Sequence, residues 1–299
     1  AGYGQLAIII PLLLAAPRWF AKEVQVGWIM QVSNAFGQVQ GAMSYFVDAY
    51  TTIAQWCSVV RRLDGFNRHV GEALDLKSDL MIDNASNITV GIENVDVFLP
   101  NKNKDILIKD CTIDLMKYQS LLIMGASGVG KSTLLRTLAG LWPYAKGNVY
   151  LPKEEEFLFL PQRPYLPLGS LRQAISYPVV EEVISEKYSD EEIKEILIAC
   201  KLENLADKLD IVDDWSRILS LGEQQRIAFV RILLYRPEFV FLDEATSALD
   251  EDLEGNLYDM LKIHLPNTKI ISIAHRSSLI AKHQAILRLK EKGCWEIHE

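Results

Sequence analysis

The chain has 299 residues, of which 49% are hydrophobic and 23% charged, and its formal net charge is −8 at pH 7. Because the net charge is negative and no basic stripe occurs along the sequence, nucleic-acid binding is disfavoured. The four cysteines lie scattered without metal-ligand spacing, which argues against a disulfide framework and favours a reducing compartment.

The N-terminal part of the chain is poor in charge. Residues 6–16 form an uninterrupted apolar run, which is shorter than the about 20 residues that a membrane helix needs. Since the chain opens on Ala-Gly-Tyr without an initiator methionine, we expect it to begin inside a membrane helix. A signal peptide is the alternative, but no basic region precedes the run and a second apolar segment follows. The charged residues among the first 60 are Arg18, Lys22, Glu23 and Asp48.

That second segment, residues 28–60, is moderately apolar with polar residues dispersed through it. Such a mixture predicts a helix that contacts lipid on one face and a polar cavity on another. Gly37 and Gly41 are spaced for close helix packing, although this signal is weak. Positive charge at the end of a span indicates its cytoplasmic side, with residues 22–27 as the turn on the opposite side. The charge comes from Arg61, Arg62 and Arg68.

These features predict three parts in the chain. Residues 1–75 would be the end of a transmembrane domain, with its last two helices and a cytosolic extension. Residues 76–88 are polar and predict a linker. Residues 89–299 would form a second domain.

The strongest motif is in residues 125–133, which read GASGVGKST and fit G-x-x-x-x-G-K-[ST] at every fixed position. An apolar run over residues 121–124 predicts a strand before it, and residues 133–139 predict a helix after it. Backbone N–H groups of such a loop cradle phosphates, Lys131 reaches the β- and γ-phosphates, and Ser132 ligates Mg²⁺. The predicted ATP ligands are Gly125, Ala126, Ser127, Gly128, Val129, Gly130, Lys131, Ser132 and Thr133.

A second acidic feature follows later in the chain. Residues 239–242 are apolar and end in Asp243 and Glu244, which predicts a buried parallel strand that carries two acids at its C-terminal end. Asp243 would hold Mg²⁺. Glu244 would polarise the attacking water as general base.

Two further patterns predict elements of the second domain. Residues 190–200 repeat apolar residues at helical spacing, within an acidic stretch over residues 178–214. Residues 286–297 predict a terminal hairpin. His275 follows the apolar run 270–273 and is a functional candidate. The remaining histidines have no motif context and are predicted at the surface: His69, His264, His283 and His298.

In this order, the motifs resemble the ATP-binding cassette (ABC) superfamily over residues 89–299. The resemblance implies an α/β P-loop NTPase fold with a helical subdomain. It implies that Gln162 senses the γ-phosphate and Mg²⁺, that residues 247–250 form the D-loop, and that His275 contacts the γ-phosphate. Residues 219–223 read LSLGE and match the signature motif, with Leu221 and Glu223 in place of the usual glycine and glutamine.

The signature implies a dimer. In this superfamily it serves the ATP of the partner subunit, so we expect Ser220, Gly222 and Glu223 to complete the site of a second copy. A serine hydroxyl and a glycine amide at a helix N-terminus make an anion site. By motif position Phe98 would stack on adenine, the alternative being a core strand residue.

The N-terminal segment also carries a resemblance. Residues 16–20, 35–42 and 62–66 look like the last two helices of the group that joins SbmA/BacA-like transporters to the fatty-acyl (subfamily D) transporters. This implies an ATPase that drives transport of a peptide, cobalamin-like or fatty-acyl solute across a bacterial inner or organelle membrane, with the ATPase domain in the cytosol. The alternatives are a soluble ABC ATPase that acts on nucleic acid or ribosomes, and an ATP-gated regulator that transports nothing.

Overall fold

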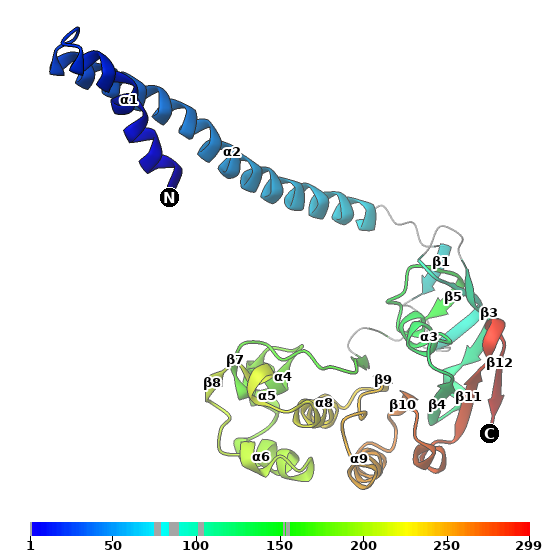
Figure 1. The fold of residues 1–299 in the computed structure, drawn as a ribbon. Helices are drawn as coiled ribbons and strands as arrows, with labels where there is room; N and C mark the ends of the chain where they lie inside the picture. Colours follow the sequence, from blue (N-terminus) through cyan, green and yellow to red (C-terminus); the bar gives the residue numbers. More distant parts are fainter. Residues whose placement is uncertain (1, 75–78, 84–89, 101–104, 152, 154–155) are drawn as a thin grey trace. The chain divides into compact units, whose positions relative to one another are not determined.

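The fold is that of a computed structural model, which describes residues 2–74, 79–83, 90–100, 105–151, 153 and 156–299. The chain divides into two compact units, residues 1–76 and residues 77–299 (Figure 1). Residues 76–78 and 84–88 of the predicted linker lie outside the described residues.

The first unit contains helices α1, Gly2–Phe20, and α2, Val26–Leu74, which pack against each other (Figure 1). The turn between them includes Lys22 with a φ of 59°. Both predicted helical segments are therefore helical. Helix α2 has 49 residues and continues well past residue 60, where the second apolar segment ends.

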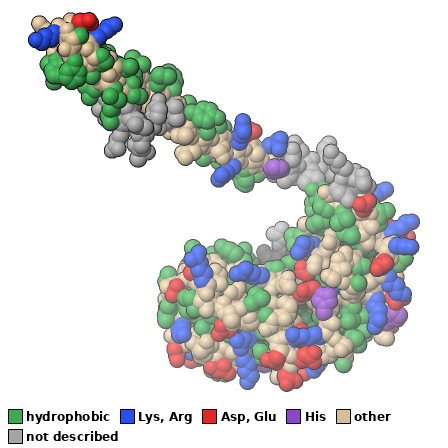
Figure 2. Space-filling view, in the orientation of Figure 1, with side chains coloured by type: hydrophobic (Ala, Val, Ile, Leu, Met, Phe, Trp, Pro, Cys, Tyr) green, Lys and Arg blue, Asp and Glu red, His purple; other side chains and the backbone are tan. Residues whose placement is uncertain are grey.

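Apolar side chains cover much of the surface of this unit (Figure 2). On α1 the exposed ones include Leu13, Leu14 and Phe20. Yet among the described residues no helix combines the length and the apolar character that crossing a membrane requires. The predicted membrane spans are thus not confirmed. Polar residues such as Gln31 and Asn34 dilute the apolar character of α2.

The second unit is built on a largely parallel sheet with the strand order β12-β11-β4-β10-β9-β6. Strands β6, β9, β10, β4 and β11 run parallel, and β12 pairs antiparallel with β11 as the predicted terminal hairpin. The strands are β4 Ser120–Gly125, β6 Phe157–Leu160, β9 Phe239–Asp243, β10 Lys269–Ile273, β11 Ala285–Leu289 and β12 Trp295–His298.

A smaller sheet has the order β1-β5-β2-β3. Its strands are β1 Asp79–Asp83, β2 Gly91–Phe98, β3 Ile106–Asp114 and β5 Ala145–Tyr150. Strand β1 lies inside the segment that the sequence predicts as a linker and pairs parallel with β5. Within this segment Leu80, Met81 and Ile82 are apolar, and the buried side chain of Leu80 joins the core.

Strand β9 is buried along its whole length, as predicted, and separates two cores. Alternate side chains of a strand point to opposite faces of the sheet. Accordingly Phe239 and Phe241 join the core under α3 (Lys131–Leu138) and the smaller sheet. Val240 and Leu242 join the other core, which packs under α8 (Leu221–Tyr235) and α9 (Glu251–His264).

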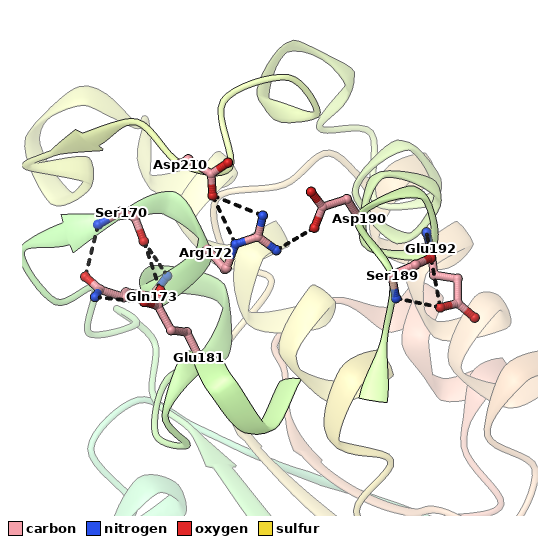
Figure 3. Close-up of polar contacts among 8 residues, drawn as sticks. All are labelled: Ser170, Arg172, Gln173, Glu181, Ser189, Asp190, Glu192 and Asp210. Atoms are coloured by element: carbon pink, nitrogen blue, oxygen red, sulfur yellow. Dashed lines mark hydrogen bonds and ion pairs between the residues drawn. The ribbon is translucent and has the colours of Figure 1, made fainter. Parts of the chain in front are cut away.

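The acidic stretch over residues 178–214, which the sequence predicts as helical, contains helices α5 and α6 and ends in the strand β8 Val212–Asp213, which pairs with β7 Gly169–Ser170. Ser170 and Ser189 each begin a helix with a reciprocal capping box, and Arg172 joins Asp190 to Asp210 (Figure 3). The remaining elements are α4 Leu171–Ser176, α5 Glu181–Lys187, α6 Asp190–Ala199, α7 Trp215–Ile218, and the 3-10 turns Leu115–Lys117, Glu203–Leu205, Ser277–Lys282 and Glu291–Gly293.

Candidate functional site

The phosphate-binding loop joins the end of β4 to the start of α3, as the sequence predicts. Gly128 and Gly130 have φ angles of 79° and 104°, a region that side chains with a Cβ rarely adopt. At Gly125 a Cβ would lie 2.6 Å from the carbonyl oxygen of Leu289. The glycines are therefore required by the course of the backbone, and the loop ends on the N-terminus of α3, where anions bind.

Lys131 is held inside this loop with only 6% of its surface exposed. Its Nζ donates to the carbonyl oxygens of Gly125 at 3.0 Å and Ala126 at 2.9 Å. Burial lowers the pKa of Lys131, and the nearby carboxylates of Glu244 and Asp243 partly offset this. The carbonyl groups of the loop backbone therefore hold the Lys131 ammonium in place.

Asp243 lies at the end of β9 and contacts the phosphate-binding loop directly. Its Oδ1 accepts a hydrogen bond from Ser132 Oγ at 2.6 Å, and its Oδ2 lies 3.5 Å from Arg136 Nη2. No cluster of three or more His, Cys, Asp or Glu suited to a metal occurs in the described part of the chain. A hydroxyl beside one carboxylate fits Mg²⁺, which takes few protein oxygens and completes its shell with water and phosphate.

Glu244 stands between two other predicted residues. Its Oε1 lies 2.8 Å from His275 Nε2, and its Oε2 accepts from Gln162 Nε2 at 3.1 Å. Glu244 directly follows β9, Gln162 follows β6 and His275 follows β10. These three strands are neighbours in the sheet. Glu244 has a φ of 51°, an uncommon conformation for a residue with a side chain, and such residues cluster at functional sites.

The signature residues form the start of a helix. Ser220 is the N-cap of α8, which begins at Leu221, and forms a capping box with Glu223. Glu223 Oε2 accepts from Ser220 N at 2.9 Å and Ser220 Oγ at 2.8 Å. Burial raises the pKa of Glu223, but hydrogen bonds from Ser220 and Asn204 outweigh it and leave the pKa lowered.

Within one chain the signature stays apart from the phosphate-binding loop. No hydrogen bond or ion pair among the described residues joins Ser220, Gly222 or Glu223 to residues 125–133. The structure therefore brings together the loop, Asp243, Glu244, Gln162 and His275, but not the signature.

Phe98 ends strand β2 and is half-buried. Its carbonyl oxygen accepts from Trp142 Nε1 at 3.1 Å, and its N–H donates to Tyr144 O at 2.8 Å. The rings of Trp142 and Tyr144 lie 5.5 Å apart edge to face. Phe98 thus lies beside two aromatic residues that the sequence analysis does not assign to the site.

Sequence reasoning also missed a buried carboxylate near the D-loop. Glu254 in α9 is 2% exposed, accepts a short hydrogen bond from Thr246 Oγ1, and pairs with Arg276 Nη1 at 3.3 Å. It therefore connects the segment after Glu244 to the residue that follows His275. Its position in the first turn of an amphipathic helix gives no signal, because acidic residues are common there.

Comparison with known proteins shows which families the chain resembles. Residues 108–247 match the ABC transporter family, and residues 1–71 match the SbmA/BacA-like family. An uncharacterized ABC transporter ATP-binding protein of Haemophilus influenzae is 42% identical over 98% of this chain and 48% of its own length. A protein of the same description from Synechocystis is 36% identical over 99% of the chain and 45% of its own length.

A plant relative extends the comparison. ABC transporter D family member 2, chloroplastic, of Arabidopsis thaliana is 34% identical over 96% of the chain and 50% of its own length. The chain spans about half the length of these curated relatives. The phosphate-binding loop, the acidic pair after β9 and the family matches agree: the chain belongs to the ABC transporter family, with an ATP-binding domain preceded by an SbmA/BacA-like segment.

Proposed function

We propose that this chain belongs to a half-transporter that couples ATP hydrolysis to the movement of a solute across a membrane. The observation that carries the proposal is the contact of Glu244 with both Gln162 and His275, beside the pair of Ser132 and Asp243. The proposal is supported by the ABC transporter match over residues 108–247, which include Ser132, Gln162, Asp243 and Glu244.

The residues divide the chemistry among them. Glu244 acts as general base on the attacking water, while Gln162 and His275 hold its carboxylate and contact the γ-phosphate. Lys131, the loop N–H groups and the start of α3 neutralise charge on the phosphoryl oxygens. Ser132, Asp243 and Gln162 would hold Mg²⁺, whose charge would stabilise the phosphates further.

We infer that the working unit is a homodimer with two shared sites. Among the described residues, the signature residues Ser220, Gly222 and Glu223 make no hydrogen bond to the phosphate-binding loop of their own chain, and Ser220 with the N-terminus of α8 would form an anion site. A second copy facing the first would place this anion site on the ATP of its partner. Phe98 would stack on the adenine of the same ATP.

The first unit supports the transport part of the proposal. It matches the SbmA/BacA-like family and exposes a broad apolar surface, including Leu13, Leu14 and Phe20 of α1. We propose that these helices belong to a membrane-embedded region and that the ATPase domain faces the cytosol. The solute would be a peptide, a cobalamin-like molecule or a fatty-acyl compound. A soluble ATPase that acts on nucleic acid or ribosomes would have no use for this segment.

The decisive experiment replaces Glu244 with Gln, which keeps the size of the side chain and removes its basicity. We expect ATP hydrolysis to fall about 100-fold or more while ATP binding is retained, because general-base catalysis contributes on that order. Hydrolysis is measured as phosphate release, and binding with a fluorescent ATP analogue.

Glu251→Gln is the matched control, since Glu251 is exposed at the start of α9 and its replacement makes the same charge change. It should leave hydrolysis unchanged. Near-normal hydrolysis by Glu244→Gln would exclude Glu244 as the base.

A further inference from the structure

We propose that Gln225 is a positioning residue for the hydrolytic site, through which the start of α8 controls the partners of Glu244; this inference rests on the proposed function. Gln225 lies in the second turn of α8 and is fully buried, with 0% of its surface exposed. It belongs to none of the groups to which the sequence assigns a role.

The side chain of Gln225 bonds to two separate loops at once. Its Nε2 donates to the carbonyl oxygen of Gln162 at 2.9 Å and to Ser247 Oγ at 3.1 Å. Its Oε1 accepts from the backbone N–H of Ala248 at 2.9 Å. Both N–H groups and the oxygen are therefore used, which is what a fully buried amide requires.

These partners surround Glu244. Gln162, whose carbonyl Gln225 holds, donates from its own side chain to Glu244 Oε2 at 3.1 Å. Ser247 donates its backbone N–H to the carbonyl oxygen of Glu244 at 3.1 Å. Gln225 thus holds two segments in place. One is the backbone of Gln162, whose side chain reaches the Glu244 carboxylate, and the other is the turn that follows Glu244.

The first turn of α8 also packs tightly on this turn. A Cβ on Gly222 would lie 3.4 Å from the carbonyl oxygen of Ala248 and 3.5 Å from Leu249 Cδ2. A shift of α8 therefore pulls on residues 247–249 and on Gln162 together. The same helix begins with Ser220, so an anion bound there acts on the element that holds the partners of Glu244.

The neighbouring Gln224 shows that burial in this helix does not by itself create such a link. It is 3% exposed and donates to the carbonyl oxygens of Ser216 at 2.9 Å and Leu219 at 2.8 Å, both in the segment just before α8. Its Oε1 has no hydrogen-bond partner. Of the two adjacent buried glutamines, Gln225 is the one whose hydrogen bonds reach other loops.

The test compares Gln225→Met and Gln225→Glu in the full chain purified in detergent. Met keeps the volume and removes all three hydrogen bonds, whereas Glu keeps an acceptor for Ala248 N–H and loses both donated bonds. Each is made alone and in a Gln162→Ala background. The measurements are kcat and KM for MgATP hydrolysis and the melting temperature.

We expect Gln225→Met to lower kcat about 10-fold or more with KM changed less than about 3-fold, because displaced groups near the reacting atoms cost rate rather than affinity. In the Gln162→Ala background it should lower kcat little further, since residues that act through one another are not additive. If Met prevents folding, Gln225→Glu is read by the same criteria.

Thr268→Val is the matched control. Thr268 is 7% exposed, lies at the opposite end of β10, and donates a hydrogen bond to Pro237 O at 2.7 Å. It should lower the melting temperature without changing kcat. An unchanged kcat in the Gln225 variants, or equal falls with and without Gln162, overturns the positioning role. If Glu244→Gln also leaves hydrolysis unchanged, the proposed function fails instead.

Discussion

At the scale of single residues, the candidate site contains a lysine with a lowered pKa and a glutamate with an uncommon backbone conformation. Lys131 is almost wholly buried, and burial lowers its pKa, yet its Nζ is satisfied by two loop carbonyls. Glu244 has a left-handed backbone conformation, and its carboxylate contacts His275 and Gln162. Both arrangements prepare charge and geometry before a nucleotide binds, which is how electrostatic catalysis works.

His283, which the sequence predicts at the surface, is half-buried in the structure. Its ring bonds to Leu279 O at 2.9 Å and Ser272 Oγ at 3.1 Å and lies 5.3 Å from the ring of Tyr258. Burial is the main cause that lowers its pKa from 6.5 to about 4.

This predicts a pH dependence of stability. Between pH 6.5 and about 4 the unfolded chain binds a proton at His283 that the folded chain does not. The free energy of unfolding should therefore be highest above this window and fall by up to about 3 kcal/mol as the pH drops through it. Denaturant unfolding between pH 7 and about 4.5 measures the slope, which His283→Gln should reduce.

The exposed His264 provides the comparison, and His264→Gln should keep the slope of the original chain. Equal slopes for His283→Gln and the original chain would mean that other groups cause the pH dependence.

At the scale of elements, helix N-termini are built with one repeated device. Reciprocal capping boxes begin α4, α6 and α8, with the serines Ser170, Ser189 and Ser220. Each serine accepts from a backbone N–H that the helix cannot satisfy itself. Of these three boxes, the one of α8 lies in the signature, so the same structural element caps all three helices and is proposed to bind a ligand in one of them.

This shared device gives a matched pair of variants. Ser220→Ala and Ser189→Ala should each lower the free energy of unfolding by about 1 kcal/mol, because each removes an N-cap. We expect only Ser220→Ala to lower ATP hydrolysis, since only this serine is proposed to contact the partner's ATP. Denaturant unfolding and phosphate release are measured on both variants. Equal hydrolysis by the two would argue against the signature role of Ser220.

At the scale of the whole molecule, the parallel sheet collects residues that are far apart in the chain. Strands β4, β10, β9 and β6 are consecutive neighbours in the sheet and end at the same edge. Open α/β sheets bind ligands at the carboxyl ends of their strands. This edge therefore carries the phosphate-binding loop, Asp243, Glu244, Gln162 and His275, and in the proposed homodimer the signature would serve the second copy.

Mixing two inactive variants tests the shared site. Lys131→Ala disables the phosphate-binding loop, and Ser220→Arg blocks the signature. Each variant alone should be inactive, whereas a mixed dimer has one site with an intact loop and an intact signature. An equal mixture after subunit exchange should recover about a quarter of the original hydrolysis, from half the dimers with one active site each. No recovery despite proven exchange would exclude this pairing.

Several local features of this protein could be predicted from its sequence. The phosphate-binding loop, the buried strand before Asp243, the helix over residues 190–199 and the terminal hairpin were all predicted, because each depends on spacing within a short window. Motif order then indicated which of these segments share a site, and Gln162, Glu244 and His275 do lie in contact.

The contacts that support the candidate site could be seen only in the tertiary structure. The hydrogen bonds of Gln225 to Gln162 and Ala248, the pairing of Glu254 with Arg276, and the hydrogen bond of His283 with Ser272 join residues that share no local pattern. A buried polar side chain is satisfied by whichever backbone group the packing brings near it, and that depends on how whole strands and helices meet. Sequence spacing therefore predicted the candidate site residues, and the packing of strands and helices determines which groups hold them in place.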